Sequence, residues 1–142
     1  GVPELGYSWL YRIFLDFKGK NWKLVRMVTI RGHHGWGGGS RTQGADLTKY
    51  SKDVAYWDAD LFLYGHVHRL QSDEIPRLGL NKTGKLIARP KAMVLCGTFL
   101  KTFSLDTTPS YSEKAGYPPV SIGGATITIR AKDDWVKMKV ST

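Results

Sequence analysis

Cysteine is almost absent from the sequence. Cys96 is the single cysteine in 142 residues, so the chain cannot form a disulfide within itself. Disulfides are typical of oxidising compartments, and the lack of a partner thiol favours a reducing one, which we expect to be the cytoplasm.

Long apolar runs are absent as well. No run approaches the roughly 20 residues that a membrane-spanning helix needs. The first residues, Gly1-Val2-Pro3-Glu4, lack the basic and apolar regions of a signal peptide. We therefore expect a soluble, unexported protein with no membrane partner. Because the first residue is not methionine, we expect the numbering to begin inside a longer reading frame, after processing, or after a tag scar.

Acidic residues are scarce relative to basic ones. Lys and Arg number 21 against 12 Asp and Glu, which gives a formal net charge of +9. Such an excess favours polyanionic partners or phosphorylated substrates, nucleic acid among them. The basic residues are spread over the chain, however, and lysines on strands also keep a protein soluble and protect sheet edges. Both interpretations stay open.

Repeats, low-complexity tracts and linkers are also lacking, so we expect residues 1–142 to form a single domain. Runs of aromatic and β-branched residues, broken by turn residues, predict a strand-rich protein. The expected strands cover residues 9–17, 22–31, 60–65, 70–80, 85–90, 92–98, 125–131 and 135–141. The first two and the last two flank short polar segments and predict β-hairpins. Residues 104–119 show no periodicity and predict a loop.

One helix stands out among these strands. Apolar residues recur at helical spacing between residues 47 and 58, behind Asp46, which can cap the N-terminus. A single helix beside so many strands predicts an α+β domain with an excess of strand. Because a large sheet must bury a face, part of its cover is expected to be missing from the chain.

All four histidines occur in two tight pairs. His33 and His34 follow one expected strand, and His66 and His68 follow the glycine that ends another. Neutral imidazole is a good metal ligand, and an extended His-x-His places both rings on one side. Strand ends are also where ligand sites collect. The alternative is that these are surface or hydrogen-bonded histidines without a ligand.

The segment DADLFLYGHVH at residues 58–68 resembles the closing Gly-His-x-His signature of the calcineurin-like metallophosphoesterase superfamily. Upstream, VTIRGHHG at 28–35 and WGGGSRTQGA at 36–45 resemble a phage and prophage branch of that superfamily. Downstream, CGTF at 96–99 and YSEKAGYPP at 111–119 are similar to the same branch. The resemblance is to the C-terminal half of the domain and suggests a phage or bacterial source.

The resemblance implies a fold and a set of ligands. The fold would be α+β (α/β), the C-terminal half of an αββα sandwich, with a strand-rich mixed sheet and the one main helix at 47–58. In a divalent metal pair (Mn, Zn, Fe or Ni), His66 would bind one metal and His68 the other. His34 would join His66, with His33 as the alternative ligand.

The superfamily's earlier motifs, Asp-x-His, Gly-Asp-x-x-Asp and Gly-Asn-His-Asp/Glu, do not occur in this sequence. With them go the bridging carboxylate and the remaining ligands, so we expect at most partial metal occupancy and no catalytic residue in this chain. The complete protein would hydrolyse a phosphomonoester or phosphodiester, with nucleic acid as a candidate substrate, and this chain alone would be inactive.

Glycines surround the segment after His34. They permit close backbone approach to an anion, with Ser40 and Arg41 as candidate phosphate contacts, although no P-loop follows. The alternative is a flexible loop beside the metal site. Trp36 would either stack on a base or pack under this loop.

Two other functions remain open. The chain could be a truncated or degenerate, non-catalytic half that self-associates to cover its sheet and binds polyanions through its charge. A separate chain could instead supply the missing N-terminal half.

Overall fold

A computed structural model describes residues 4–40, 42, 44–105, 108–132 and 135–142. Arg41 therefore lies outside the described residues. The strands are β1 (Ser8–Gly19), β2 (Trp22–His33), β3 (Leu61–Tyr64), β4 (Leu70–Ile75), β5 (Leu78–Leu80), β6 (Leu86–Ala88), β7 (Lys91–Cys96), β8 (Thr126–Lys132) and β9 (Trp135–Ser141). The helices are α1 (Ala45–Ser51), α2 (Asp53–Tyr56) and α3 (Tyr111–Lys114).

The central element is a five-stranded sheet in the order β1-β2-β3-β7-β4. Strands β2, β3 and β7 are parallel, whereas β1 and β4 pair antiparallel at the two edges. Hairpin β1–β2 turns over Lys20 and Asn21 and pairs along its whole length, which confirms the first predicted hairpin. Hairpin β8–β9 confirms the last one.

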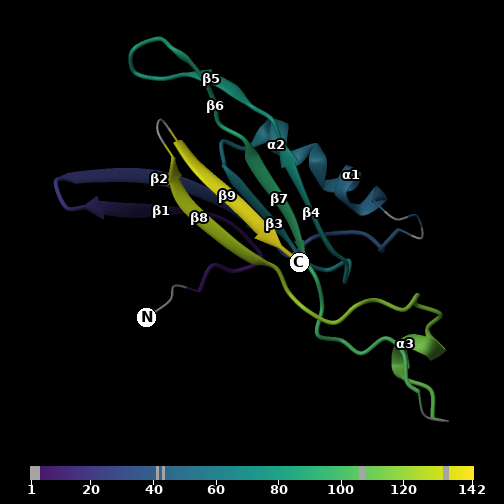
Figure 1. The fold of residues 1–142 in the computed structure, drawn as a ribbon. Helices are drawn as coiled ribbons and strands as arrows, with labels where there is room; N and C mark the ends of the chain where they lie inside the picture. Colours follow the sequence, from purple (N-terminus) through teal and green to yellow (C-terminus); the bar gives the residue numbers. More distant parts are fainter. Residues whose placement is uncertain (1–3, 41, 43, 106–107, 133–134) are drawn as a thin grey trace.

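The two faces of this sheet are covered differently. Helices α1 and α2 lie on one face, where Tyr50 packs with Phe62 and Met93 in a buried cluster. Hairpin β8–β9 lies on the other face, where Val136 packs with Val28 and further apolar residues of β3 and β7. Figure 1 shows β8 and β9 in yellow, in front of the central strands, with the helices at the side of β4 and β7.

The expected α+β (α/β) half-sandwich is wrong, because the chain is mostly β. Strand accounts for 47% of the structure and helix for 11%. The physical reason is that the described helices are only four to seven residues long, whereas hairpin β8–β9 adds a further β layer over the sheet. The β5–β6 and β8–β9 pairs remain separate two-stranded sheets.

The main helix also differs from its prediction. In place of one helix at 47–58, α1 and α2 are separated by Lys52 and end before Trp57, whose backbone is extended. The N-cap is Gly44, at a φ of 82°, so Asp46 does not cap the helix. Its carboxylate is buried and serves the loop before the helix instead.

Two further predictions need correction. The strand expected at residues 70–80 is divided into β4 and β5, because Pro76 lacks the N–H that a strand interior requires. The loop expected at 104–119 contains α3, whose first turn has a capping box formed by Ser110 and Glu113. Among the described residues, the helices are all too short or too polar to cross a bilayer.

Candidate metal centre

The two histidine-bearing loops leave the sheet side by side. Strands β2 and β3 are parallel, and their last residues, His33 and Tyr64, are register partners. The next residues along each strand therefore emerge at the same edge. The backbone N–H of Gly65 donates to the carbonyl of His33 at 3.4 Å, which keeps the two loops together beyond the strands.

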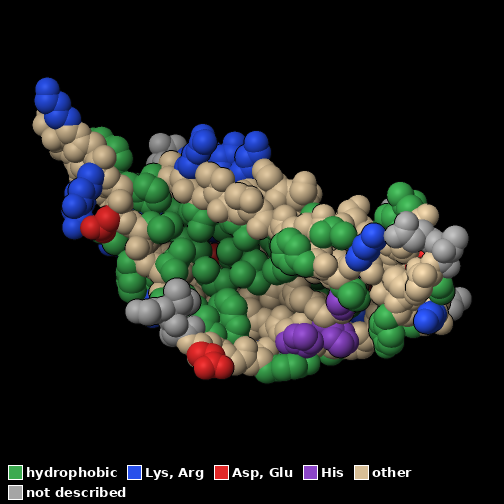
Figure 2. All heavy atoms as spheres, turned by 90° about the horizontal axis from the view of Figure 1, so that it is seen from below, with side chains coloured by type: hydrophobic (Ala, Val, Ile, Leu, Met, Phe, Trp, Pro, Cys, Tyr) green, Lys and Arg blue, Asp and Glu red, His purple; other side chains and the backbone are tan. Residues whose placement is uncertain are grey.

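This arrangement brings His34 and His66 into contact. Nε2 of His34 lies 3.0 Å from Nδ1 of His66, and both rings are exposed to solvent. One nitrogen donates and the other accepts, and which does which depends on the tautomers. Figure 2 shows histidine side chains gathered in one place at the surface.

The close approach requires glycine at Gly35. Its φ is +103°, and a Cβ at this position would lie 2.6 Å from the carbonyl oxygen of Gly65. A Cβ at Gly65 would in turn lie 3.1 Å from the carbonyl oxygen of His34. Any larger residue at Gly35 would push the two loops apart, because the nearest atom belongs to the backbone and cannot rotate away.

His33 is held in a different way. Its Nδ1 accepts the backbone N–H of Gly35 at 2.8 Å. Its ring lies edge-on to Tyr7 and Trp36, with centroids 5.2 and 5.0 Å away. Burial, and then the positive charge of Arg31, lower the pKa of His33. The ring is thus neutral at pH 7 and engaged in shaping the turn, whereas His34 faces His66.

The Gly-His-x-His segment is not extended. His66 and His68 both have left-handed backbones, with φ of 69° and 56°, so the expected alternation of an extended strand does not apply. Nδ1 of His68 lies 2.7 Å from Oγ1 of Thr98, which follows β7. The structure brings His34 and His66 together and places His68 against Thr98.

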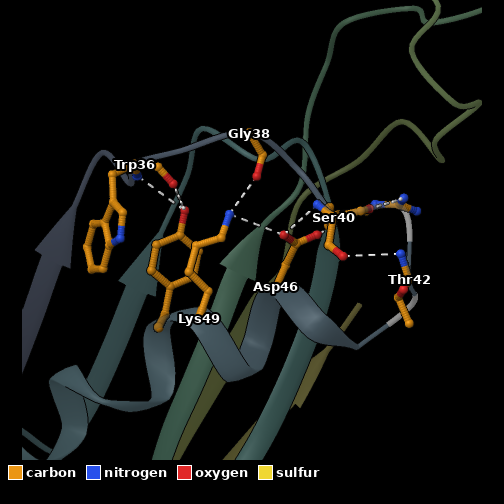
Figure 3. Close-up of polar contacts among 8 residues, drawn as sticks. Trp36, Gly38, Ser40, Thr42, Asp46 and Lys49 are labelled. Carbon is orange, nitrogen blue, oxygen red and sulfur yellow. Dashed lines mark hydrogen bonds and ion pairs between the residues drawn. The ribbon is translucent and has the colours of Figure 1, made fainter.

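Helix α1 fixes the glycine-rich loop through side chains one turn apart. The buried carboxylate of Asp46 accepts the backbone N–H of Ser40 at 2.9 Å. Lys49 donates to the carbonyl of Gly38 at 2.6 Å, and the hydroxyl of Tyr50 bonds both backbone groups of Trp36 at 3.1 and 3.2 Å. Figure 3 shows these side chains pointing from the helix to the loop. The loop is therefore anchored at several points along its length.

Trp36 and Ser40 take part in this anchoring. The Trp36 ring packs edge-on against Tyr50, with centroids 4.6 Å apart. Of the two roles considered for Trp36, stacking on a base and packing under the loop, this contact agrees with packing. The Ser40 hydroxyl accepts the N–H of Thr42 at 3.1 Å, and its carbonyl accepts Arg69 at 3.1 Å. Both Ser40 groups already have partners within the protein.

Sequence reasoning gave Asp46 another role and missed Lys49, Arg69 and Thr98, which support the site. Asp46 lies 3.4 Å from the Lys49 ammonium and 3.9 Å from Nε of Arg69, and these two cations flank the loop. Thr98 orients His68. The sequence places Arg69 directly after His68 and Lys49 three residues after Asp46, which are the two signals for these cations.

The two histidines alone would not complete a metal site. Within the described part of the chain, no three His, Cys, Asp or Glu side chains come close enough together to hold a metal ion. Among the described residues, the imidazoles of His34 and His66 lie together, and that of His68 lies against Thr98. Comparisons with protein-family models, curated proteins and solved structures gave no match to this chain.

Proposed function

We propose that this chain carries the imidazole side of a two-metal phosphoesterase site, and that the complete protein hydrolyses phosphomonoesters or phosphodiesters. The observation that supports it is the pair His34 and His66, whose nitrogens lie 3.0 Å apart at the ends of two parallel strands. This chain alone is expected to be inactive, since the carboxylate motifs do not occur in it.

The separation of the two nitrogens suits one shared metal ion. Zinc binds histidine nitrogen at about 2.0–2.1 Å, so two such ligands lie roughly 3.0 to 3.4 Å apart at angles between 90° and tetrahedral. To bind one metal, both rings would turn so that these nitrogens face it, and the hydrogen between them would move to the other nitrogen of its own ring. Metal ions in such a pair polarise phosphoryl oxygens and supply a hydroxide at neutral pH.

The surroundings support an anionic substrate. His68, positioned through the hydroxyl of Thr98, is the proposed ligand of the second metal, because ligating histidines characteristically have their other nitrogen hydrogen-bonded. The cationic groups of Lys49 and Arg69 flank the loop after His34. The net charge of +9 would draw phosphorylated substrates or nucleic acid to the site.

The proposal is tested by hydrolysis of an aryl phosphodiester and an aryl phosphomonoester with added Mn²⁺ or Zn²⁺. The complete protein should hydrolyse at least one of them, and His66→Ala should lower the rate by at least about 100-fold, since a first-row metal loses a ligand. Lys20→Ala, at the far turn of β1–β2, is the control and should leave the rate unchanged. Equal rates for the wild type and His66→Ala would refute the assignment.

A second function, polyanion binding without catalysis, is favoured by the outer face of hairpin β8–β9. Its solvent-facing residues are Thr126, Thr128, Arg130, Lys132, Lys137, Lys139 and Ser141. None of these described residues is acidic, and Arg130 lies directly opposite Lys137. Like charges opposite each other destabilise a sheet, and a bound polyanion would remove that repulsion.

Salt dependence separates this second function from the first. Binding of a single-stranded oligonucleotide should weaken steeply with salt and should not need metal. The double variant Lys137→Ala, Lys139→Ala should flatten the logarithmic salt slope by about 1.4, at about 0.7 per lost contact. The control pair Lys20→Ala, Lys23→Ala lies at another end of the molecule, and an equal loss from it would rule out a role specific to β8–β9.

A further inference from the structure

Strand β1 has a long free edge. It lies at the end of the central sheet, and no strand within the described residues pairs with its outer side. The His34 N–H donates to the Tyr7 carbonyl at 2.8 Å, just beyond the Ser8–His33 register pair. Because such bonds recur at every second residue of an antiparallel ladder, the odd-numbered residues of β1 bond to β2. The even-numbered residues, from Ser8 to Lys18, present their N–H and C=O groups outward.

Exposed apolar side chains lie beside this edge, between charged ones. Phe14 is 67% exposed and Leu10 47%, and Met27, the register partner of Phe14 on β2, is 41% exposed. They lie on the face that the helices cover over β3 and β7 but leave open over β1 and β2. A long unpaired strand edge flanked by exposed apolar side chains is a template for pairing with another strand.

We infer that β1 pairs antiparallel with β1 of a second copy of this chain, with the two Phe14 residues facing each other on the two-fold axis. In this register Arg12 lies opposite Asp16 of the second copy, and Asp16 lies opposite its Arg12. The pairing is isologous, as expected of a symmetric dimer. Both copies contribute outward-facing backbone groups at these positions, so the ladder of hydrogen bonds continues across the axis.

Charge selects this register over its neighbours. Sliding one strand by two residues places Arg12 opposite Phe14 in one direction and opposite Lys18 in the other. Neither slide pairs Arg12 with a carboxylate. Sliding by four residues places Arg12 opposite Arg12 or Asp16 opposite Asp16, and like charges directly opposite are unfavourable. Asp16 already lies 3.3 Å from Lys23, but both side chains are about half exposed, so its carboxylate can accept a second cation.

The other face of β1 fits the same register. Ile13 would lie opposite Leu15 of the second copy, and Tyr11 opposite its Phe17. Ile13, Leu15 and Phe17 already pack at the margin of the cluster under β8–β9. The pairing would therefore extend that apolar layer from one copy to the other. Repulsion between two chains of net charge +9 opposes it, so association should strengthen when salt is raised from very low levels.

Charge reversal tests the register directly. The purified chain should sediment as a dimer at micromolar concentration. Arg12→Asp and Asp16→Arg each turn two attractive pairs into repulsive ones and should each raise the dimer Kd by about 10- to 30-fold. The double variant Arg12→Asp, Asp16→Arg restores both pairs and should return the Kd to near the wild-type value.

A monomeric wild type at about 100 μM, or a double variant as weak as the single variants, would overturn the inference. Phe14→Lys should dissociate the dimer, whereas Leu78→Lys, at an equally exposed apolar residue of β5, should not.

Cross-linking gives a measurement that does not depend on the stability of the charge variants. Residues directly opposite in a hydrogen-bonded antiparallel pair have Cα atoms about 5.5 Å apart, within disulfide range. In a Cys96→Ser background, Phe14→Cys should therefore oxidise to a covalent dimer. In Leu10→Cys each new cysteine would lie opposite Lys18 and far from the same cysteine of the second copy. This variant should remain monomeric on a denaturing gel. Equal cross-linking of both variants would contradict the proposed axis.

Discussion

Replacing Asp46 with alanine should strongly destabilise the fold, because its buried carboxylate has three partners. The Asp46 residue is only 1% exposed, and its carboxylate accepts the N–H of Ser40 at 2.9 Å. It also lies near the charged groups of Lys49 and Arg69, whose side chains are 25% and 17% exposed. In Figure 3 this carboxylate is the point where the helix and the loop join.

The magnitude follows from what alanine would leave behind. An unsatisfied buried N–H costs about 1–3 kcal/mol, and loss of one partner from a buried ion pair costs about 3–5 kcal/mol. Because water still reaches both cations, we expect a loss of about 3 kcal/mol in the free energy of unfolding. For a chain of this length that corresponds to a fall in Tm of about 10 °C. Asp46→Asn keeps an acceptor for Ser40 and should lose less.

Urea unfolding followed by tryptophan fluorescence measures this change, with Asp58→Ala as the matched control. Asp58 also lies 3.9 Å from a guanidinium, that of Arg77, but its side chain is fully exposed. Water screens such a pair, so its removal should have no resolvable effect. If Asp46→Ala proved as mild as Asp58→Ala, the anchoring of the loop by α1 would be refuted.

Two further predictions concern backbone strain and pH. Gly35→Ala should lower the free energy of unfolding by at least about 2 kcal/mol, because Gly35 has a positive φ and a Cβ there would clash with Gly65. Gly38→Ala is the control, since a Cβ there meets open space and should cost little. Urea unfolding measures both changes. Burial and a hydrogen bond to Asp53 raise the pKa of Tyr64. A raised pKa keeps Tyr64 neutral in the folded state while the unfolded chain loses its proton above about pH 10, so its contribution to stability is present below pH 10 and lost above it. Chemical denaturation across pH 8–11 should show that fall, and a flat profile would contradict it.

Several parts of the fold could be predicted from local sequence. Alternating apolar residues and a polar turn were sufficient for β1–β2 and β8–β9, because both are local antiparallel pairs. The meeting of His34 with His66 follows from two strands that each end in glycine and histidine, provided the strands are parallel neighbours. The local sequence pattern does not show that β2 and β3 are parallel neighbours, because this depends on the order of strands in the sheet.

Other features depend on contacts between distant segments. Asp46 has the position of a helix cap in the sequence, but its carboxylate binds the loop and Gly44 takes the cap. His68 is oriented by Thr98, thirty residues away. The fold class was wrong because the segment expected to form one main helix forms two short ones, α1 and α2, so the chain is mostly β.

The shared metal site is tested most directly by a calorimetric titration of the 142-residue chain with Zn²⁺. We predict one binding event that needs both His34 and His66. His34→Ala should weaken the affinity by at least about tenfold, and His68→Ala should leave it nearly unchanged. No binding to the wild type, or an affinity that His34→Ala does not alter, would contradict the assignment of His34 and His66 to one metal.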